Sequence, residues 1–532
     1  MSEAKKQSFL HGTVLLAASA AIVKLIGALY KIPLNAIIGE QGFSYFNTAY
    51  DIYTVLVSIS VAGLPLAMSR MISEANALGH YNQVRRVYTT ARALYLALGL
   101  VGSLLMVLFC KQLAEFQEQP DAWFAIACLG PALLLIGIMS SFRGFFQGQG
   151  NMAPTAISQV LEAICKLIVG MGAALLLLRL TSQYSFAAGG AILGVTISCV
   201  LSAIYLFFCY RKAKRALPVS GEPAHSYGST LKRLLAISIP ITIGSSGLSL
   251  LALLETKIYM GQLIHLGYSQ DQADVMKGIY DMARTLYNMP LAFITPITIS
   301  IVPAITAYVT TKNKQDARST GESALRIMSL IIIPCMVGLA VLAEPVMGLL
   351  GGYQGNNLTL AASLMTALSF AMPLHAMVLV TNAVMQGHGH VNLPVINMFI
   401  GGIIKLICTS ILSGNPNLAI LGAPISAVIG YCAIMTLNLI TLRRCTDDPP
   451  ATLRQTIRPL IAALLMGAVV LGCRFGLQTV LGPNCSRLIL TALPVMLGVA
   501  VYAFAAIKLK AITRADCLLL PKGEKIANLL HL

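Results

Sequence analysis

Charged residues inside long apolar stretches are the side chains in this sequence best suited to do chemistry. The basic ones are Lys24, Lys166, Lys257, Arg284 and Lys405, and the acidic ones are Asp51, Glu162, Glu255 and Asp281. A charge in the hydrocarbon core of a bilayer costs about 2.5–3.5 kcal/mol unless it is paired or hydrated. Each of these residues is therefore a candidate for substrate binding, ion coupling or structural pairing.

Two of the charges have a partner of opposite sign at helical spacing. Glu162 and Lys166 are four residues apart, so on a helix they share one face and we expect them to pair. Asp281 and Arg284 are three apart and could pair in the same way, although an arginine keeps donors to spare. Lys257 is two residues from Glu255 and would face another side, so that pair is not expected.

Lys24 and Lys405 have no acidic partner nearby in the sequence, and Gly401 precedes Lys405 where Glu162 precedes Lys166. If Lys24 and Arg284 face one cavity, with Lys31 at its outer mouth, that cavity is cationic and favours an anionic substrate such as a diphosphate. The alternative for Lys24 is that its ammonium group reaches out to the membrane interface.

Glu255 is the acidic residue most suited to coupling. Its carboxylate could bind Na⁺ or carry a proton, and the alternative is a salt bridge, for instance with Lys405. No cofactor is expected beyond such a coupling ion. The twelve cysteines are scattered singly, without the spacing of a metal site.

The elements that must position these residues are transmembrane helices. Of the 532 residues, 57% are hydrophobic and only 11% are charged, whereas soluble proteins are about 25% charged. The apolar runs are about 20 residues long, which suits helices that cross a bilayer. We predict an all-α polytopic membrane protein with about fourteen transmembrane helices, among them 9–30, 44–69 and 276–308.

Lysine and arginine gather in alternate loops, with a dense cluster at 211–215 and a basic tail at 508–525. The opposite loops hold only Lys31, Lys111, Arg179, Lys277, Arg474 and Arg487. By the positive-inside rule, both termini are predicted to be cytoplasmic. The net charge of +17 then indicates anionic membrane lipids as partners and no nucleic acid.

An internal repeat organises the helices. The tetrapeptides QGQG (147–150) and QGHG (386–389) are each followed by a helix that contains KLI, at a constant offset of 239 residues, and Pro65 recurs at a similar offset as Pro303. A phosphate loop would need a preceding strand and a Lys-Ser/Thr pair, which are absent here. The glycines Gly148, Gly150, Gly387 and Gly389 are instead predicted to form tight turns, with a hinge as a further hypothesis.

The duplication predicts four parts. These are an N-lobe of six helices (1–210), a basic cytoplasmic linker (211–232), a C-lobe of six helices (233–445), and two further helices with a cytoplasmic tail (446–532). Because six is even, the lobes share one orientation and are related by a pseudo-twofold axis along the membrane normal. This plan suits alternating access, and the sequence holds no catalytic motif, so a transporter is predicted and not an enzyme.

Four stretches together resemble the multidrug/oligosaccharidyl-lipid/polysaccharide exporter superfamily, in particular the SpoVB-like and MurJ-like lipid II flippases of its polysaccharide transport branch. They are residues 24–46, 63–75, 143–168 and 280–306. The resemblance implies a V-shaped pair of lobes, with a groove for a polyprenyl tail on the last two helices. It also implies substrate-binding roles for Lys24, Lys31 and Arg284, and a cation position near Glu255.

The implied function is to move an undecaprenyl-pyrophosphate-linked oligosaccharide, foremost lipid II, from the inner to the outer leaflet of a bacterial plasma membrane. The chain departs from the MurJ type, because VSISVAGLP (57–65) is neutral and Lys405 stands where a cation site would tolerate it poorly. Three alternatives stay open: a cation-coupled multidrug exporter, an exporter of capsule or spore lipid intermediates, and a scaffold for cell-wall or sporulation synthesis enzymes. We expect a monomer.

Overall fold

The computed structural model describes residues 3–61, 63–215, 222–446, 448–451, 454–481 and 486–511. Most of these residues are helical, and no strand occurs among them. Backbone packing divides the chain into two compact units, unit 1 (1–281) and unit 2 (282–532), with the boundary inside α9 (Gln270–Ala292). The division therefore lies later than the predicted linker, and the grouping into six, six and two helices stays a prediction.

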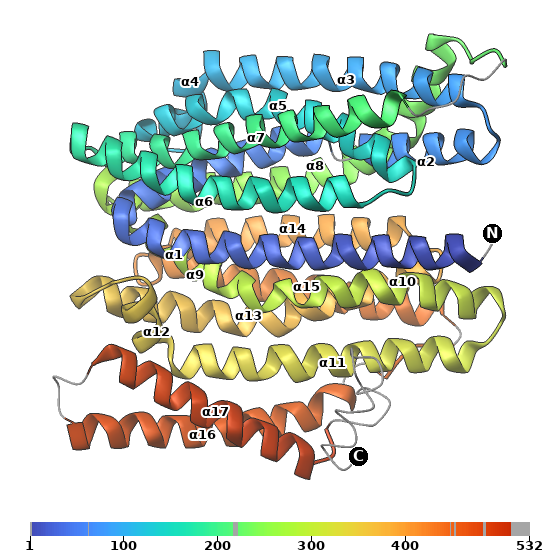
Figure 1. The fold of residues 1–532 in the computed structure, drawn as a ribbon. Helices are drawn as coiled ribbons and strands as arrows, with labels where there is room; N and C mark the ends of the chain where they lie inside the picture. The colour runs from blue at the N-terminus through green and yellow to red at the C-terminus, as the bar shows by residue number, and fades with distance from the viewer. Residues whose placement is uncertain are drawn as a thin grey trace. The chain divides into compact units, whose positions relative to one another are not determined.

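The helices of each unit run roughly parallel (Figure 1). Those before α9 are α1 (Glu3–Val61), α2 (Leu64–Ala77), α3 (Tyr81–Leu108), α4 (Cys110–Phe116), α5 (Trp123–Gly148), α6 (Ala153–Thr181), α7 (Tyr184–Arg215) and α8 (Tyr227–His265), with a 3₁₀ turn, η1 (Pro120–Ala122). Those after it are α10 (Ile294–Thr310), α11 (Lys314–Val341), α12 (Ala343–Leu350), α13 (Gly355–Gly387), α14 (Asn392–Ser413), α15 (Gly422–Cys445), α16 (Arg454–Leu481) and α17 (Arg487–Lys508), with η2 (Ala419–Leu421).

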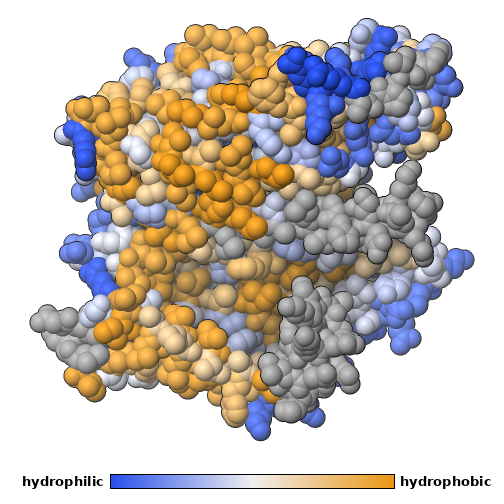
Figure 2. All heavy atoms as spheres, in the orientation of Figure 1, coloured by the Kyte–Doolittle hydropathy of each residue, from blue (hydrophilic) through white to orange (hydrophobic). Residues whose placement is uncertain are grey.

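Thirteen helical stretches of the described chain are long and apolar enough to cross a membrane. On the face in Figure 2, hydrophobic residues cover the sides of the helices and hydrophilic residues gather toward their ends. A surface of this kind suits contact with lipid along the helices and with water at their ends. The chain is therefore an all-α multi-pass membrane protein, as its composition predicts.

The N-terminal region has a kink between two of the predicted helices. The expected helices 9–30 and 44–69 lie on opposite sides of a kink at Gly39 (φ 65°, ψ −180°) in α1, which itself ends at Val61. This backbone conformation is essentially restricted to glycine, and it divides α1 into a first arm (3–38) and a second arm (40–61). The predicted helix 276–308 corresponds to one candidate span, residues 270–310, which consists of α9 and α10.

In unit 1, α5, α6 and α7 pack together, α3 packs on α5, and α8 packs against α1, α2 and α3. In unit 2, α13 packs against α10, α11 and α15, α14 packs on α15, and α16 lies between α11 and α17. The two C-terminal helices predicted in 446–532 are thus present as α16 and α17. Residues 512–532, which include the basic tail residues Arg514, Lys522 and Lys525, lie outside the described residues.

The repeated glycines have equivalent geometry in the two units. Gly150 and Gly389 have positive φ angles of 77° and 90° in the turns after α5 and α13, which confirms the predicted turns. A Cβ at Gly148 would lie 2.6 Å from Cβ of Ile72, and one at Gly387 would lie 2.8 Å from Cβ of Ile305. Gly148 and Gly387 are therefore required for close helix packing instead.

The glycine contacts also correct one part of the repeat. Ile72 and Ile305 occupy equivalent places, because each packs against the matching glycine. Ile72 lies seven residues after Pro65, whereas Ile305 lies only two residues after Pro303. Pro303 is therefore not the counterpart of Pro65; Pro296, at the start of α10, stands closer to that place.

Candidate functional site

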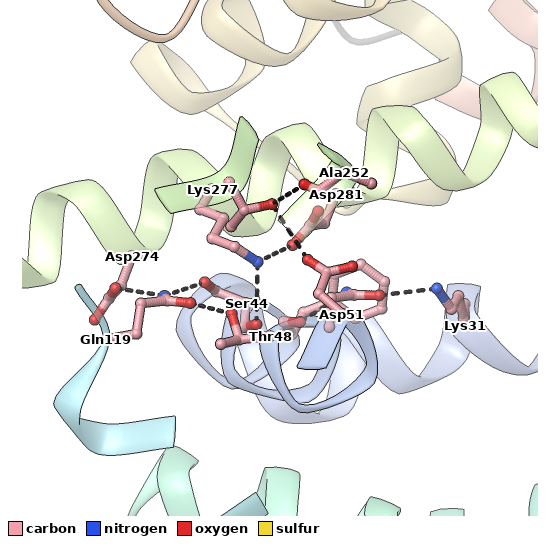
Figure 3. Close-up of polar contacts among 12 residues, drawn as sticks. Lys31, Ser44, Thr48, Asp51, Gln119, Ala252, Asp274, Lys277 and Asp281 are labelled. Carbon is pink, nitrogen blue, oxygen red and sulfur yellow. Dashed lines mark hydrogen bonds and ion pairs between the residues drawn. The ribbon is translucent and has the colours of Figure 1, made fainter. Parts of the chain in front are cut away.

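A buried polar network in unit 1 joins the second arm of α1, the segment before η1, and the start of α9 (Figure 3). Ser44, Thr48 and Asp51 are spaced by four and three residues on α1. Asp274, Lys277 and Asp281 are spaced by three and four on α9. Such spacing places each set on one face of its helix, and these two faces meet.

Lys277 is the centre of this network. Its side chain is fully buried, with 0% exposure, and its Nζ lies 2.6 Å from a carboxylate oxygen of Asp281. The same ammonium group donates to the backbone carbonyl of Ser44 at 3.4 Å. An ammonium group that is taken out of water needs a carboxylate and further acceptors in this way. The ion pair lies within α9, and the hydrogen bond from Lys277 to Ser44 links α9 to α1.

Gln119 connects the network to the segment before η1. Its Nε2 donates to Oγ of Ser44 and to Oδ1 of Asp274, both at 2.6 Å, and its Oε1 accepts from the hydroxyl of Thr48. The hydroxyl of Tyr45 donates to the other carboxylate oxygen of Asp274 at 3.0 Å. The buried carboxylate of Asp274 therefore receives hydrogen bonds on both oxygens.

Backbone contact between α9 and α1 fixes where the network forms. A Cβ at Gly278 would lie 1.9 Å from the carbonyl oxygen of Glu40. Glu40 follows the kink at Gly39 directly, so only glycine at 278 lets α9 approach α1 this closely. Asp274, Lys277 and Asp281 are thereby brought within hydrogen-bonding reach of the second arm.

The cationic residues predicted to bind substrate are found in different settings. Lys31 is half-buried, donates to Oδ1 of Asn47 at 2.8 Å, and lies 5.9 Å from the ring centre of Phe43. It thus connects the two arms of α1 across the kink. The side chain of Lys24 lies outside the described residues. Arg284 is a half-buried residue of α9 in unit 2, and a cavity shared by these three residues stays a prediction.

The candidate coupling residues lie on α8 and α1. Glu255 is buried, with 7% exposure. Lys257, two residues further along α8, lies 3.8 Å from the ring centre of Phe116. Asp51 accepts a hydrogen bond from the hydroxyl of Thr256 at 3.4 Å, which links α1 to α8. Na⁺ or H⁺ coupling through Glu255 stays a prediction.

The predicted pair between Glu162 and Lys166 was wrong. Glu162 forms an ion pair with Arg143 of α5 at 3.0 Å, and Nε of Arg143 also donates to Ser158 at 3.0 Å. Lys166 instead lies 5.7 Å from the ring centre of Tyr30. Arginine, with its fork of donors, can reach a serine and a carboxylate at once, so the interhelical contact is preferred to the local one.

Lys405 also lies near an aromatic ring, in unit 2. Its Nζ is 5.7 Å from the ring centre of Tyr431, which stacks on His375 at 4.3 Å. Nδ1 of His375 lies 2.9 Å from the hydroxyl of Tyr287. Within the described residues, no group of three or more His, Cys, Asp or Glu side chains could hold a metal ion.

Sequence reasoning missed Asp274, Gln119 and the burial of Lys277. Lys277 was assigned to an outer loop, but α9 already begins at Gln270. The spacing of Lys277 and Asp281 by four residues could have indicated the ion pair. No sequence signal places Gln119 beside them, because this contact depends on the packing of a segment that lies more than a hundred residues away.

Comparisons with known proteins give the family. A family model described as polysaccharide biosynthesis protein matches residues 9–309. Lipid II flippase MurJ of Bacillus subtilis (strain 168) is 25% identical over 480 residues, which cover 87% of each chain. Stage V sporulation protein B of the same organism is 26% identical over 447 residues, or 82% of this chain and 84% of the relative.

Solved structures agree at the level of the fold. A lipid II flippase MurJ in an inward closed conformation matches with a TM-score of 0.70 and 12% identity, over 93% of this chain and 98% of that chain. An inward-facing multidrug resistance MATE family transporter of the MOP superfamily matches with a TM-score of 0.66 and 16% identity, over 80% and 98%. These relatives are transporters and not enzymes, in agreement with the prediction. Since the family model matches more than half of the sequence, the chain belongs to the polysaccharide biosynthesis protein family.

Proposed function

We propose that this protein is a flippase that moves a lipid-linked oligosaccharide across the bacterial plasma membrane by alternating access, with lipid II as the leading substrate. The observation that carries the proposal is the similarity to lipid II flippase MurJ of Bacillus subtilis (strain 168) over 87% of both chains. In this proposal both termini are cytoplasmic, because they lie on the same side of the predicted helices as the basic clusters, and basic loops face the cytoplasm.

The polar residues of unit 1 support a transporter. Buried charges such as Lys277 and Asp281 are costly in a membrane protein and mark functional positions by default. The hydrogen bond from Lys277 to the carbonyl of Ser44 links α9 to the kinked α1. We propose that Lys24, Lys31 and Arg284 provide the positive charge that receives the diphosphate of the substrate, through charge-assisted hydrogen bonds.

A translocation assay tests the function. The purified protein is placed in vesicles that contain fluorescent lipid II in both leaflets, and an impermeant quencher then reports how fast the inner pool becomes accessible. We expect faster exchange than in protein-free vesicles, and imposed Na⁺, H⁺ and voltage gradients identify the coupling. Exchange no faster than in protein-free vesicles, with protein shown to be folded, would refute the proposal.

Single substitutions test the proposed binding residues. Lys24→Ala and Arg284→Ala should abolish growth of a bacterium that depends on this protein as its lipid II flippase, while the variant still reaches the membrane. Lys212→Ala, in the basic end of α7, is the matched control and should support growth. Full growth with both Lys24→Ala and Arg284→Ala would remove these residues from the site.

A multidrug exporter is the second candidate, because the fold also matches a multidrug resistance MATE family transporter. That function predicts drug resistance on expression that is lost in Glu255→Gln. The sporulation relative keeps a spore or capsule lipid intermediate open as the substrate. Replacing lipid II in the vesicle assay with other undecaprenyl-diphosphate sugars distinguishes these substrates. A scaffold would move none of them and would co-purify with a glycosyltransferase.

A further inference from the structure

A pocket of about 250 Å³ lies in unit 2 where one end of α11 meets the start of α16 and the end of α17. Five basic side chains line it, Arg318, Arg326, Arg454, Arg458 and Lys510, against one carboxylate, Glu322. That carboxylate is engaged by Arg318 at 2.9 Å and by the backbone N–H of Ala451 at 3.0 Å. Arg318 also pairs with Asp448 at 2.5 Å, so five basic groups face two carboxylates and the pocket keeps an excess of positive charge.

Neighbouring groups hold the guanidinium groups in place. Nη1 of Arg326 donates to Oε1 of Gln455 at 3.0 Å, and Nη2 donates to Oγ of Ser323 at 3.2 Å. Nη1 of Arg458 donates to the carbonyl of Lys510 at 3.0 Å. A guanidinium group carries five N–H donors in a planar fork. Fixed guanidinium forks match the oxygens of a phosphate group.

The start of α16 adds to this preference for an anion. The helix begins at Arg454, and its first residues line the pocket. The first backbone N–H groups of a helix have no partner within the helix and carry the positive end of its dipole. Phosphate groups bind at helix starts for this reason. The pocket thus combines side-chain and backbone donors.

The position of the pocket along the helices matches the level of lipid headgroups. α11 and α16 each have 28 residues, or about 42 Å at 1.5 Å per residue, which exceeds the hydrocarbon core of about 30 Å. The pocket lies at one end of both candidate spans. Ile461 and Leu465 follow Arg454 and Arg458 by seven residues each, so they continue the same face two turns deeper.

Ile461 and Leu465 are 45% and 51% exposed. A basic pocket next to exposed apolar residues complements a membrane lipid, which has an anionic headgroup and an apolar chain. A soluble anion would contact only the pocket. We propose that this pocket binds the phosphate group of a membrane lipid, whose chain lies along Ile461 and Leu465. The inference rests on the pocket and the apolar residues beside it, and it does not depend on which substrate is transported.

Lipid binding to the purified full-length protein in detergent tests the proposal. Native mass spectrometry measures the affinity for phosphatidylglycerol in the wild type and in Arg454→Gln/Arg458→Gln. The matched control is Arg211→Gln/Lys212→Gln, which removes the same charge from the basic end of α7, where Phe208, Arg211, Lys212 and Arg215 line another cavity. We expect about tenfold weaker binding in the pocket variant and less than a twofold change in the control.

Two further variants keep the test independent of misfolding. The single variant Arg454→Gln alters an exposed residue and should weaken binding several-fold without a change in melting temperature. Leu465→Asn should weaken the binding of phosphatidylglycerol but not that of glycerol phosphate. Equal losses in the pocket and control variants would overturn the proposal, since binding would then follow surface charge alone.

Competition identifies the source of the phosphate. Undecaprenyl diphosphate that displaces phosphatidylglycerol from the wild type, but not from the pocket variant, would support the proposal and give the transported lipid as the ligand. Displacement by inorganic phosphate at the same concentration as the lipid would overturn it, because the pocket would then bind a free anion.

Discussion

The two copies of the repeat use different polar groups to connect equivalent helices. In unit 1, Arg143 of α5 reaches Ser158 and Glu162 of α6. In unit 2, the positions at the offset of 239 residues are Asn382, Asn397 and Gly401. There Nδ2 of Asn438 donates to Asn382 at 2.8 Å, and its Oδ1 accepts from Asn397 at 2.9 Å. An ion pair is thus replaced by a neutral amide cluster.

The backbone contacts of the repeat have changed less than its polar groups. Gly148 and Gly387 each pack closely against an isoleucine side chain. Gly150 and Gly389 each have a positive φ angle. At Gly401, a Cβ would lie 2.1 Å from Ile434, so no glutamate fits where unit 1 has Glu162. Closer helix packing therefore excludes the carboxylate, and amides that satisfy one another take its place. The distance between the helix backbones thus limits which polar side chains can lie between them in each copy.

The largest expected difference between the copies is in the cost of removing one polar partner. Arg143→Ala leaves the half-buried carboxylate of Glu162 without its ion pair and should cost about 3 kcal/mol. Asn382→Ala removes a neutral partner and should cost about 1–2 kcal/mol. Melting temperatures of the purified variants in detergent measure both. Adding Glu162→Gln to Arg143→Ala should restore most of the loss; equal losses in the two single variants would contradict the comparison.

A smaller effect, equal in the two copies, is expected at the packed glycines. Gly148→Ala and Gly387→Ala each place a Cβ against the Cβ of an isoleucine that cannot move without its backbone, and should cost about 1–3 kcal/mol by overpacking. Gly172→Ala and Gly338→Ala are the helical controls, since nothing lies within 4 Å of either added Cβ. Losses as small as those of the controls would show that the helices can separate at these points.

The same variants examine the hinge hypothesis. A substitution that keeps its helices apart should slow transport if Gly148 or Gly387 lies at a moving contact. Normal transport by Gly148→Val and Gly387→Val, in protein that reaches the membrane, would count against a hinge in either copy.

The sequence predicted the helical class and the repeat well, because both depend on patterns along the chain. Apolar runs and the KLI recurrence need no knowledge of tertiary contacts. The break between the predicted helices 9–30 and 44–69 agrees with the kink at Gly39, but the apolar pattern does not show that one glycine forms it. The pairs at Glu162 and Asp274 depend instead on which helices pack together, so local spacing gave the wrong partner for Glu162 and none for Asp274.

The glycine turns should show the smallest effect and sharpen the comparison most. Gly150→Ala and Gly389→Ala force alanine into the left-handed region, where open space surrounds the added Cβ, and each should cost about 1 kcal/mol. Asparagine tolerates this region better, so Gly150→Asn and Gly389→Asn should cost less than the alanine variants in melting temperature. If asparagine is no better than alanine in one copy only, the two turns differ in more than backbone conformation. Equal behaviour would mean that the duplicated chain conserved its turns while its polar contacts diverged.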